Sequence, residues 1–269
     1  MTGRTETRFV IERGRATLTL ARPDIRNALT GPEMIQEILL AITEAEDDPE
    51  VRVLVIGAEG PAFSAGGNVK DMRDRAGLFA GTPDRIAEGY RRSIQRLTAS
   101  LLGTDLVTLA SVPGPAVGAG FDLVLGCDLR IGSTSARFAH TFVDLGIVPG
   151  DGGAWLLPRV VGWQRAAELA FTGRSLDAYE ALEAGILLEV VEPEALESRV
   201  DELAGVIAAK PAHSVRLAKR LLRHARTMDL DEFLDLSAAF QAIAHHEPAH
   251  VEAVERYVAA WEERKRRGK

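Results

Sequence analysis

The sequence predicts an α/β body followed by a helical C-terminal segment. Strand and helix patterns alternate along most of the chain, and from Pro193 onward nearly every pattern is helical. Such an order is typical of a helix-covered sheet with a helical segment after it. The chain has 269 residues, 46% of them hydrophobic, which is enough for one large core. We expect a core over residues 1–195 and a helical segment over residues 196–269.

The first elements are a hairpin, a helix and a buried strand. Residues 8–23 contain two alternating apolar runs around a tight turn, which predicts two paired strands. Residues 30–48 have helical apolar spacing, with Thr30 as a candidate cap and a proline in the first turn. Residues 51–59 form an apolar run typical of a buried strand.

The alternation continues through the middle of the chain. The amphipathic run 82–104 predicts one long helix with Thr82 as its cap. After it we expect, in chain order, a strand over 106–112, a turn into a helix over 114–128, a strand over 129–133, helices over 151–162, 163–173 and 175–185, and a strand over 186–191.

Four helical patterns end the chain. Pro211 and Pro248 stand where new helices would begin, a position that proline tolerates. The expected helices cover residues 194–210, 212–225, 230–244 and 248–265.

Composition excludes several function classes. The formal net charge of −7 argues against a nucleic-acid surface, and the basic run 263–269 reads as a solvated tail. The longest uncharged apolar stretch, residues 106–121, is interrupted by two prolines and too short to span a membrane. Cys127 is the one cysteine, and the N-terminus lacks the apolar core of a signal peptide. We expect a cytoplasmic protein.

Motifs for nucleotides and metals are incomplete. The run VGAGFDL has Leu123 where a dinucleotide fingerprint needs its third glycine, and there is no GxxxxGK[ST] loop. Pro248 breaks the helical register among His245, His246 and His250, so these histidines predict a helix junction rather than a metal site. We expect no metal and no separate cofactor.

Two glycine turns are more informative. The first glycine turn (residues 63–68, FSAGGN) leaves a buried strand, and the second glycine turn (residues 115–122, PAVGAGFD) enters a helix. Each offers a backbone N–H that no bulky side chain covers. Two such groups can form an oxyanion hole for a thioester enolate, and a helix N-terminus favours the negative charge. Taken alone, glycines of this kind more often form structural turns.

Five motifs together resemble those of the crotonase superfamily, the enoyl-CoA hydratase/isomerase family. In chain order they are RPDIRNAL, GPAFSAGGNVKDM, GPAVGAGFDLVLGCDLRI, ARFAHTFVDLGIVPGDGGAWLLPRVVG and FTGRSLDAYEALEAGILLEVV. The resemblance covers roughly residues 8–260. It implies a spiral of ββα units whose C-terminal helices drive assembly into a homotrimer or a homohexamer built as a dimer of trimers. It also implies an acyl-CoA substrate, with the adenine end near the RPDIRNAL loop.

The resemblance also implies which residues form the site. The oxyanion-hole donors would be the backbone N–H groups of Gly67 and Ala119; the family usually has glycine at the second position, and alanine keeps the N–H. The residues implied to bind the substrate are Arg26, Ala28, Ala65, His140 and Phe142.

The acid/base set departs from the family pattern. Family hydratases use two glutamates, one to activate water and one to protonate the α carbon. The first position is Asp122 here, whose side chain is shorter by about 1.5 Å. The second is Phe142, which cannot transfer a proton. The ordinary two-glutamate mechanism therefore does not carry over.

Three nearby residues are candidate replacements. Asp144 would share a face with Phe142 in an extended stretch, Asp151 precedes a helix, and His140 could pair with an aspartate. Each also has a structural interpretation: Asp144 as a loop brace, Asp151 as a helix cap and His140 as a core histidine.

Several functions stay open from these residues. The favoured one is an acyl-CoA enzyme that stabilises an enolate, hydratase-like or a double-bond isomerase, with Asp122 and either Asp144 or Asp151 as catalytic acids. Isomerisation tolerates the loss at Phe142 better, because one carboxylate can move the proton. Hydrolysis or C–C bond cleavage, and a non-catalytic acyl-CoA-binding protein, are the alternatives.

Overall fold

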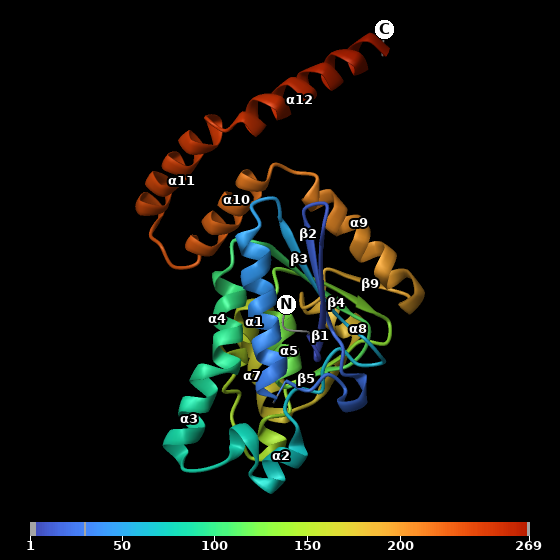
Figure 1. The fold of residues 1–269 in the computed structure, drawn as a ribbon, viewed down its shortest axis with the longest axis vertical. Coiled ribbons are helices and arrows are strands. Elements are labelled where there is room, and N and C mark those ends of the chain that lie inside the picture. Colours follow the sequence, from blue (N-terminus) through green and yellow to red (C-terminus); the bar gives the residue numbers. More distant parts are fainter. Residues whose placement is uncertain (1–3, 30, 268–269) are drawn as a thin grey trace.

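The computed structural model describes residues 4–29 and 31–267. Figure 1 shows a mixed body of strands and helices, from which the last two helices extend away. The expected α/β body with a helical C-terminal segment is confirmed. Thr30, the candidate cap, lies outside the described residues.

The main sheet has six strands in the order β1-β2-β3-β4-β6-β9. β1 and β2 are the antiparallel hairpin expected from the sequence, and each later neighbour is parallel. The strands are β1 (Thr7–Glu12), β2 (Arg15–Leu20), β3 (Val53–Ala58), β4 (Val107–Val112), β6 (Leu129–Ser133) and β9 (Glu189–Val191). Parallel strands place their carboxyl ends at one edge, which is where the two glycine turns emerge.

A smaller sheet lies beside that edge. It joins β5 (Ala116–Val117), β7 (Arg137–Ala139) and β8 (Ser175–Asp177). β5 runs parallel to β7, with Val117 opposite Ala139. This pairing sets residues 118 and 140 side by side, since the Gly118 amide donates to the Ala139 carbonyl at 2.9 Å.

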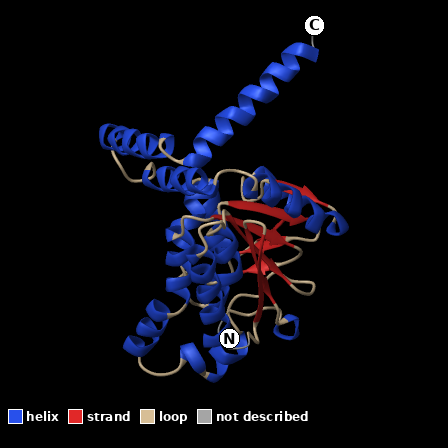
Figure 2. Cartoon of the chain, turned by 45° about the horizontal axis from the view of Figure 1, so that its top comes forward, coloured by secondary structure: helices blue, strands red, loops and turns tan. Residues whose placement is uncertain are grey.

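Helices cover both faces of the main sheet (Figure 2). The helices of the body are α1 (Pro32–Asp47), α2 (Val69–Asp74), α3 (Pro83–Arg92), α4 (Ile94–Gly103), α5 (Ala119–Leu125), α6 (Gly153–Val161), α7 (Trp163–Thr172), α8 (Ala178–Glu183) and α9 (Leu196–Ala208). The larger core includes the apolar faces of α1 and α4, with Ile38 and Leu97 buried in it. On the other face, Val200 of α9 packs with Val55 and Leu109 of the sheet.

The prediction of one long helix over residues 82–104 is wrong. The structure has two helices there, α3 and α4, because the backbone of Ser93 turns to φ −121° and ψ −99°. The Ser93 hydroxyl donates to the Gly89 carbonyl at 2.6 Å, a local bond that competes with the helical pattern. The break lets α3 turn away from α4.

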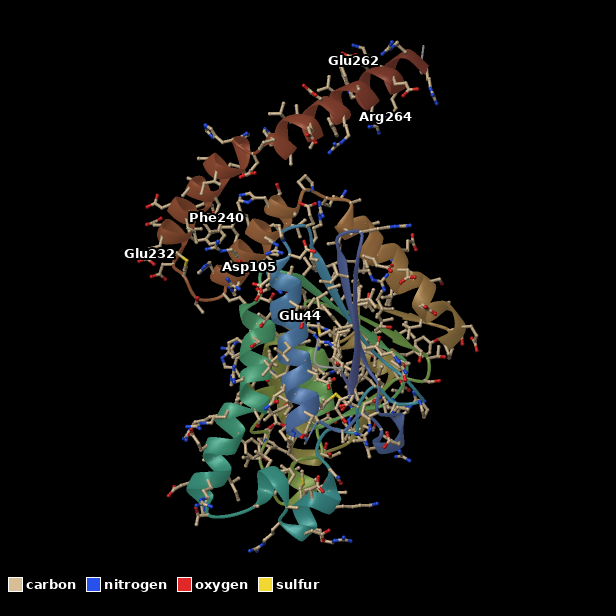
Figure 3. The ribbon with its side chains drawn as sticks, viewed as in Figure 1. Glu44, Asp105, Glu232, Phe240, Glu262 and Arg264 are labelled. Carbon is tan, nitrogen blue, oxygen red and sulfur yellow. The ribbon has the colours of Figure 1, made fainter. Side chains whose placement is uncertain are left out.

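The C-terminal helices divide into a packed part and an extended part. They are α10 (Ala212–His224), α11 (Leu230–His245) and α12 (Pro248–Arg267). α10 is held to the body by an ion pair of 3.0 Å between Arg223 and Asp105. Figure 3 shows Glu262 and Arg264 far from the body on α12. Among the described residues, no helix is long and apolar enough to cross a membrane. The division at residue 196 stays a prediction.

The RPDIRNAL loop is held by one buried side chain. Asn27 is fully buried; its amide donates to the carbonyls of Glu59 and Ala62, both at 3.0 Å, and its carbonyl accepts the Arg22 amide at 2.8 Å. Its backbone has φ 53°, which asparagine tolerates better than most residues. The side chain thus ties this loop to the segment that leads into the first glycine turn.

We predict that Asn27→Ala lowers the free energy of unfolding by about 3 kcal/mol, because it leaves buried backbone groups without partners. Urea denaturation followed by circular dichroism measures this. An effect below about 1 kcal/mol would contradict the anchoring role.

Candidate active site

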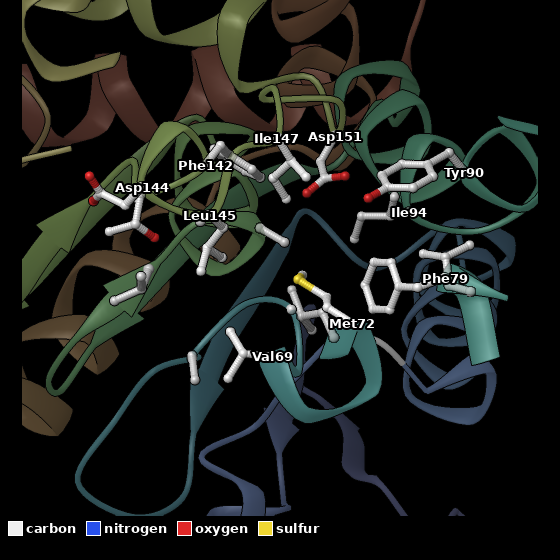
Figure 4. A pocket seen from close by; sticks show the side chains of 18 residues that line it. Val69, Met72, Phe79, Tyr90, Ile94, Phe142, Asp144, Leu145, Ile147 and Asp151 are labelled. Atoms are coloured by element: carbon white, nitrogen blue, oxygen red, sulfur yellow. The ribbon is translucent and has the colours of Figure 1, made fainter. Parts of the chain in front are cut away.

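One cavity lies where the two glycine turns approach α3 and the loop after β7. It has a volume of about 300 Å³ and is mostly apolar. Its walls are Leu29, Ala65, Gly67, Val69, Met72, Leu78, Phe79, Tyr90, Ile94, Val117, Gly118, Ala119, Thr141, Phe142, Asp144, Leu145, Ile147 and Asp151. Such a chamber, apolar with a few polar groups, is typical of a ligand site (Figure 4).

The two glycine turns touch each other. The Val117 amide donates to the Ser64 carbonyl at 3.0 Å, a short parallel bridge between the two segments. Gly66 has φ +74°, and a Cβ there would lie 2.3 Å from the Val117 oxygen and 3.0 Å from the Ala119 nitrogen. Only glycine permits this approach.

The approach brings both predicted oxyanion donors to the cavity. Gly67 and Ala119 both line it, and Ala119 is the first residue of α5. Gly118, just before it, has φ 52° and ψ −122°, and so turns the chain sharply into the helix. The helix N-terminus adds a partial positive charge at this point of the wall.

Asp151 is the buried carboxylate of the cavity wall. Its side chain is 6% exposed, and its backbone carbonyl accepts the Thr98 hydroxyl at 2.5 Å. Burial, together with the negative charge of Asp122, raises the pKa of Asp151 to about 7. Figure 4 shows its carboxylate facing the same part of the cavity as the Tyr90 hydroxyl. Asp151 can therefore accept or give a proton near neutral pH.

Asp122 lies behind the wall rather than in it. It is 2% exposed and is not among the residues that line the cavity. One carboxylate oxygen lies 3.2 Å from Nε2 of His140, and the other accepts the Gly153 amide at 3.0 Å. Burial raises the pKa of Asp122, while the bonds from His140 and Gly153 oppose that effect. The structure therefore brings Asp122 and His140 together, away from the cavity surface.

His140 and Phe142 form an aromatic contact. His140 is 1% exposed, and its ring meets the Phe142 ring edge-on, with centroids 4.8 Å apart. Phe142 lines the cavity and begins a short 3-10 turn, Val143–Leu145. The phenyl ring thus fills wall space between His140 and the cavity.

Asp144 has a different environment from Asp151. It lines the cavity but is exposed, and it packs closely on Gly173 of the α7 C-terminus, where a Cβ would lie 2.3 Å from its Oδ2. In Figure 4 it lies at the far end of the wall from Asp151. The two aspartates are thus not neighbours in the site.

The other predicted binding residues are spread around the RPDIRNAL loop. Ala65 lines the cavity, and its amide donates to the Arg26 carbonyl at 2.9 Å. The Arg26 side chain is exposed, whereas Ala28 is buried beneath the loop. Of these three, Ala65 is the one in the cavity wall.

Tyr90 is a site residue that sequence reasoning missed. It lines the cavity from α3, and burial and the charge of Asp151 raise the pKa of its phenol above the ordinary value. The signal was present, since Tyr90 and Ile94 lie four residues apart on one apolar stripe. A tyrosine in such a stripe resembles an ordinary core residue, so only the tertiary structure shows that Tyr90 lines the cavity.

No metal centre emerges from the part of the chain that is described. In residues 4–29 and 31–267, no three side chains of the types His, Cys, Asp or Glu gather closely enough to hold an ion. The contact between His245 and His250, 3.0 Å, is an exposed pair at the junction of α11 and α12.

Comparisons with known proteins agree with this architecture. The sequence profile of the family described as Enoyl-CoA hydratase/isomerase matches residues 11–267. The chain is 34% identical over 249 residues to 1,2-epoxyphenylacetyl-CoA isomerase of Escherichia coli strain K12, covering 93% of this chain and 94% of the relative. It is also 34% identical over 224 residues to crotonyl-CoA hydratase of Syntrophomonas wolfei, covering 83% of each.

A solved structure shows the same fold. The enoyl-CoA hydratase/isomerase of Cupriavidus metallidurans CH34 superposes with a TM-score of 0.86 at 32% identity, covering 97% of this chain and 96% of the other. The family resemblance predicted from the five motifs is confirmed, as is the α/β crotonase fold with C-terminal helices. The chain belongs to the enoyl-CoA hydratase/isomerase family of the crotonase superfamily and is an enzyme that acts on acyl-CoA thioesters.

Proposed function

We propose that this enzyme moves a double bond within an enoyl-CoA. The observation that carries the proposal is that Asp151 is the buried carboxylate of the cavity wall, whereas Phe142 holds the second glutamate position. Relatives carry the names of both an isomerase and a hydratase, so family membership permits either reaction. The side chains of this cavity favour the one that needs a single proton carrier.

The first step is enolate formation. The thioester carbonyl oxygen lies against the backbone N–H groups of Gly67 and Ala119, and the acyl chain fills the apolar cavity. Ionised Asp151 takes a proton from the α carbon of a 3-enoyl thioester, the C–H electrons form a dienolate, and its charge rests on the carbonyl oxygen. Two fixed N–H donors stabilise that charge without reorganisation.

The second step returns the same proton. Protonated Asp151 delivers it to the γ carbon, the double bond shifts to the α,β position, and the carboxylate is regenerated. No atom is gained or lost, so substrate and product have equal mass. A group with a pKa of about 7 suits both halves of the cycle.

Phe142 supports isomerisation over hydration. Addition of water requires one group that activates the water and another that protonates carbon. Asp122 is enclosed behind the cavity wall, and Asp144 is an exposed residue of that wall. Asp151 is therefore the one buried carboxylate among the described residues that line the cavity. The phenyl ring at position 142 also removes space for a water molecule.

The assembly is a homotrimer or a homohexamer in this proposal. α11 and α12 extend from the body and carry exposed apolar side chains. These are Leu230, Leu234, Ile243, Val251, Val254, Tyr257, Val258 and Trp261. Helices with such faces are typical of segments that pack on another subunit.

Mass spectrometry with a panel of acyl-CoAs tests the reaction. Incubation of 3-enoyl and 2-enoyl thioesters in D₂O is expected to give isomers of unchanged skeleton that contain little deuterium, because Asp151 returns the proton that it removed. A gain of one water, loss of carbon dioxide or release of free CoA as the main product would contradict isomerisation and identify hydration, decarboxylation or hydrolysis instead.

A further inference from the structure

We propose that Asp122 and His140 form a buried positioning pair that holds the turn carrying Asp151 and sets a negative charge behind it. Neither side chain lines the cavity, so neither touches the substrate. The inference rests on the proposed function for the role of Asp151 and extends it to residues one layer deeper.

The carboxylate of Asp122 is fixed from two sides. Oδ1 lies 3.2 Å from His140 Nε2, and Oδ2 accepts the Gly153 amide at 3.0 Å. Gly153 is the first residue of α6 and lies two residues after Asp151. A Cβ at Gly153 would be 2.0 Å from Asp122 Oδ1, so the glycine is required for this contact. The pair therefore sets where the Asp151 turn lies.

The surroundings of His140 indicate which ring nitrogen carries the proton. Among the described residues, its Nδ1 atom is buried without a hydrogen-bond partner. A bare lone pair is more easily tolerated there than an unpaired N–H. We therefore assign the proton to Nε2, from which it is donated to Asp122. The carboxylate then accepts two hydrogen bonds, which favour its ionised form and work against the burial that raises the pKa of Asp122.

Two aromatic rings pack against the histidine of the pair. The His140 ring meets Phe142 with centroids 4.8 Å apart and Phe121 with centroids 6.2 Å apart, both nearly perpendicular. These rings cover His140, and Asp122 is itself buried, so a charge on Asp122 acts on its neighbours with little screening. Phe142 thus has a second effect besides filling the cavity wall.

Three helices contribute the groups around Asp151. α5 contributes Asp122, with His140 behind it, and α3 contributes the Tyr90 phenol. α4 contributes the uncharged Thr98, whose hydroxyl binds the Asp151 backbone. The negative charge on Asp122 opposes ionisation of Asp151, in line with the raised pKa of that carboxyl. Removing the charge should move the titration of Asp151 to lower pH.

The test is a ¹³C NMR titration of protein labelled at the aspartate carboxyl carbons, with the Asp151 signal assigned by its loss in Asp151→Asn. In Asp122→Asn, which keeps the shape of the side chain, we expect the midpoint of Asp151 to fall by about one pH unit. His140→Leu should lower it as well, because Asp122 without its donor becomes protonated. His140→Gln, which keeps a donor, should remain near the wild-type value.

Asp144→Asn is the matched control, since it removes the same charge from an exposed position in the wall. Its Asp151 midpoint should equal that of the wild type. Equal midpoints in wild type and folded Asp122→Asn would overturn the proposal. If Asp122→Asn does not fold, equal midpoints in His140→Leu and His140→Gln overturn it.

Turnover separates this inference from the proposed function. If the isomerase proposal holds, the rising limb of the plot of kcat/KM against pH should shift to lower pH in Asp122→Asn, as the NMR midpoint does. If wild type turns over no enoyl thioester while the midpoint still moves, the proposed reaction fails and the positioning pair stands.

Discussion

Asp151→Asn should lower kcat for double-bond migration by roughly 100- to 10,000-fold, the usual contribution of a positioned acid/base. The amide keeps the size of the side chain but can neither accept nor deliver the proton. KM should change little, because the apolar wall and the backbone N–H groups proposed to bind the thioester remain. Steady-state assays that follow the α,β-unsaturated thioester by its absorbance measure both constants.

Asp144→Asn is the control for charge, because it lies in the same wall and is exposed. It should retain most of the activity. The opposite ranking, with Asp144→Asn the more damaging variant, would transfer the acid/base role to Asp144.

The same Asp151→Asn variant should gain stability at alkaline pH. The folded protein holds the pKa of Asp151 at about 7, above the value of about 3.9 in an unfolded chain. A carboxyl whose pKa is raised by folding binds its proton more tightly in the folded state than in the unfolded chain. Its contribution to the free energy of unfolding is therefore full below pH 4 and is lost as the pH rises toward 7. The loss is at most about 4 kcal/mol. Urea denaturation at pH 5 and pH 8 should show this decline in the wild type and not in the variant.

Ala119→Pro should lower kcat/KM by roughly 100- to 1,000-fold, the loss expected when one oxyanion donor is removed. Proline lacks the backbone N–H but is tolerated at the first position of a helix, which Ala119 occupies in α5. The substitution therefore removes one hydrogen-bond donor and leaves the helix in place. The deficit should lie mainly in kcat, because the N–H bonds the enolate more strongly than the neutral carbonyl.

Ala119→Gly is the matched control, since it keeps the N–H and restores the residue common in the family. Its activity should stay close to that of the wild type. Circular dichroism and thermal unfolding show whether Ala119→Pro keeps its fold. A folded Ala119→Pro enzyme with normal kcat/KM would show that this amide does not stabilise the enolate.

The amino-acid sequence predicted most of the long helices and the first two strands. The hairpin, α1 and the four C-terminal helices follow from local periodicity and proline positions, which act over a few residues. The one long helix expected over residues 82–104 is two helices, because a single hydroxyl at Ser93 competes with the helical bond. Whether such a serine bends a helix depends on what the helix then packs against, which its own sequence does not encode.

The candidate site was likewise predicted only in part. The sequence was enough to find the two glycine turns, Phe142 and the three aspartates, because they stand at fixed positions within the family motifs. The sequence was not enough to predict which aspartate is buried in the cavity wall. Asp122, Asp144 and Asp151 are chemically alike, and they differ only in burial and neighbours.

The sequence by itself thus determined the family, the α/β body and the set of acids available to the enzyme, since these depend on composition and local spacing. Only the tertiary structure decided that Asp151 lines the cavity, that Asp122 is enclosed with His140, and that Tyr90 joins the wall. The reason is that burial and electrostatic environment arise from contacts between elements distant in the chain. The pairing of β5 with β7, which sets His140 beside the start of α5, is one such contact.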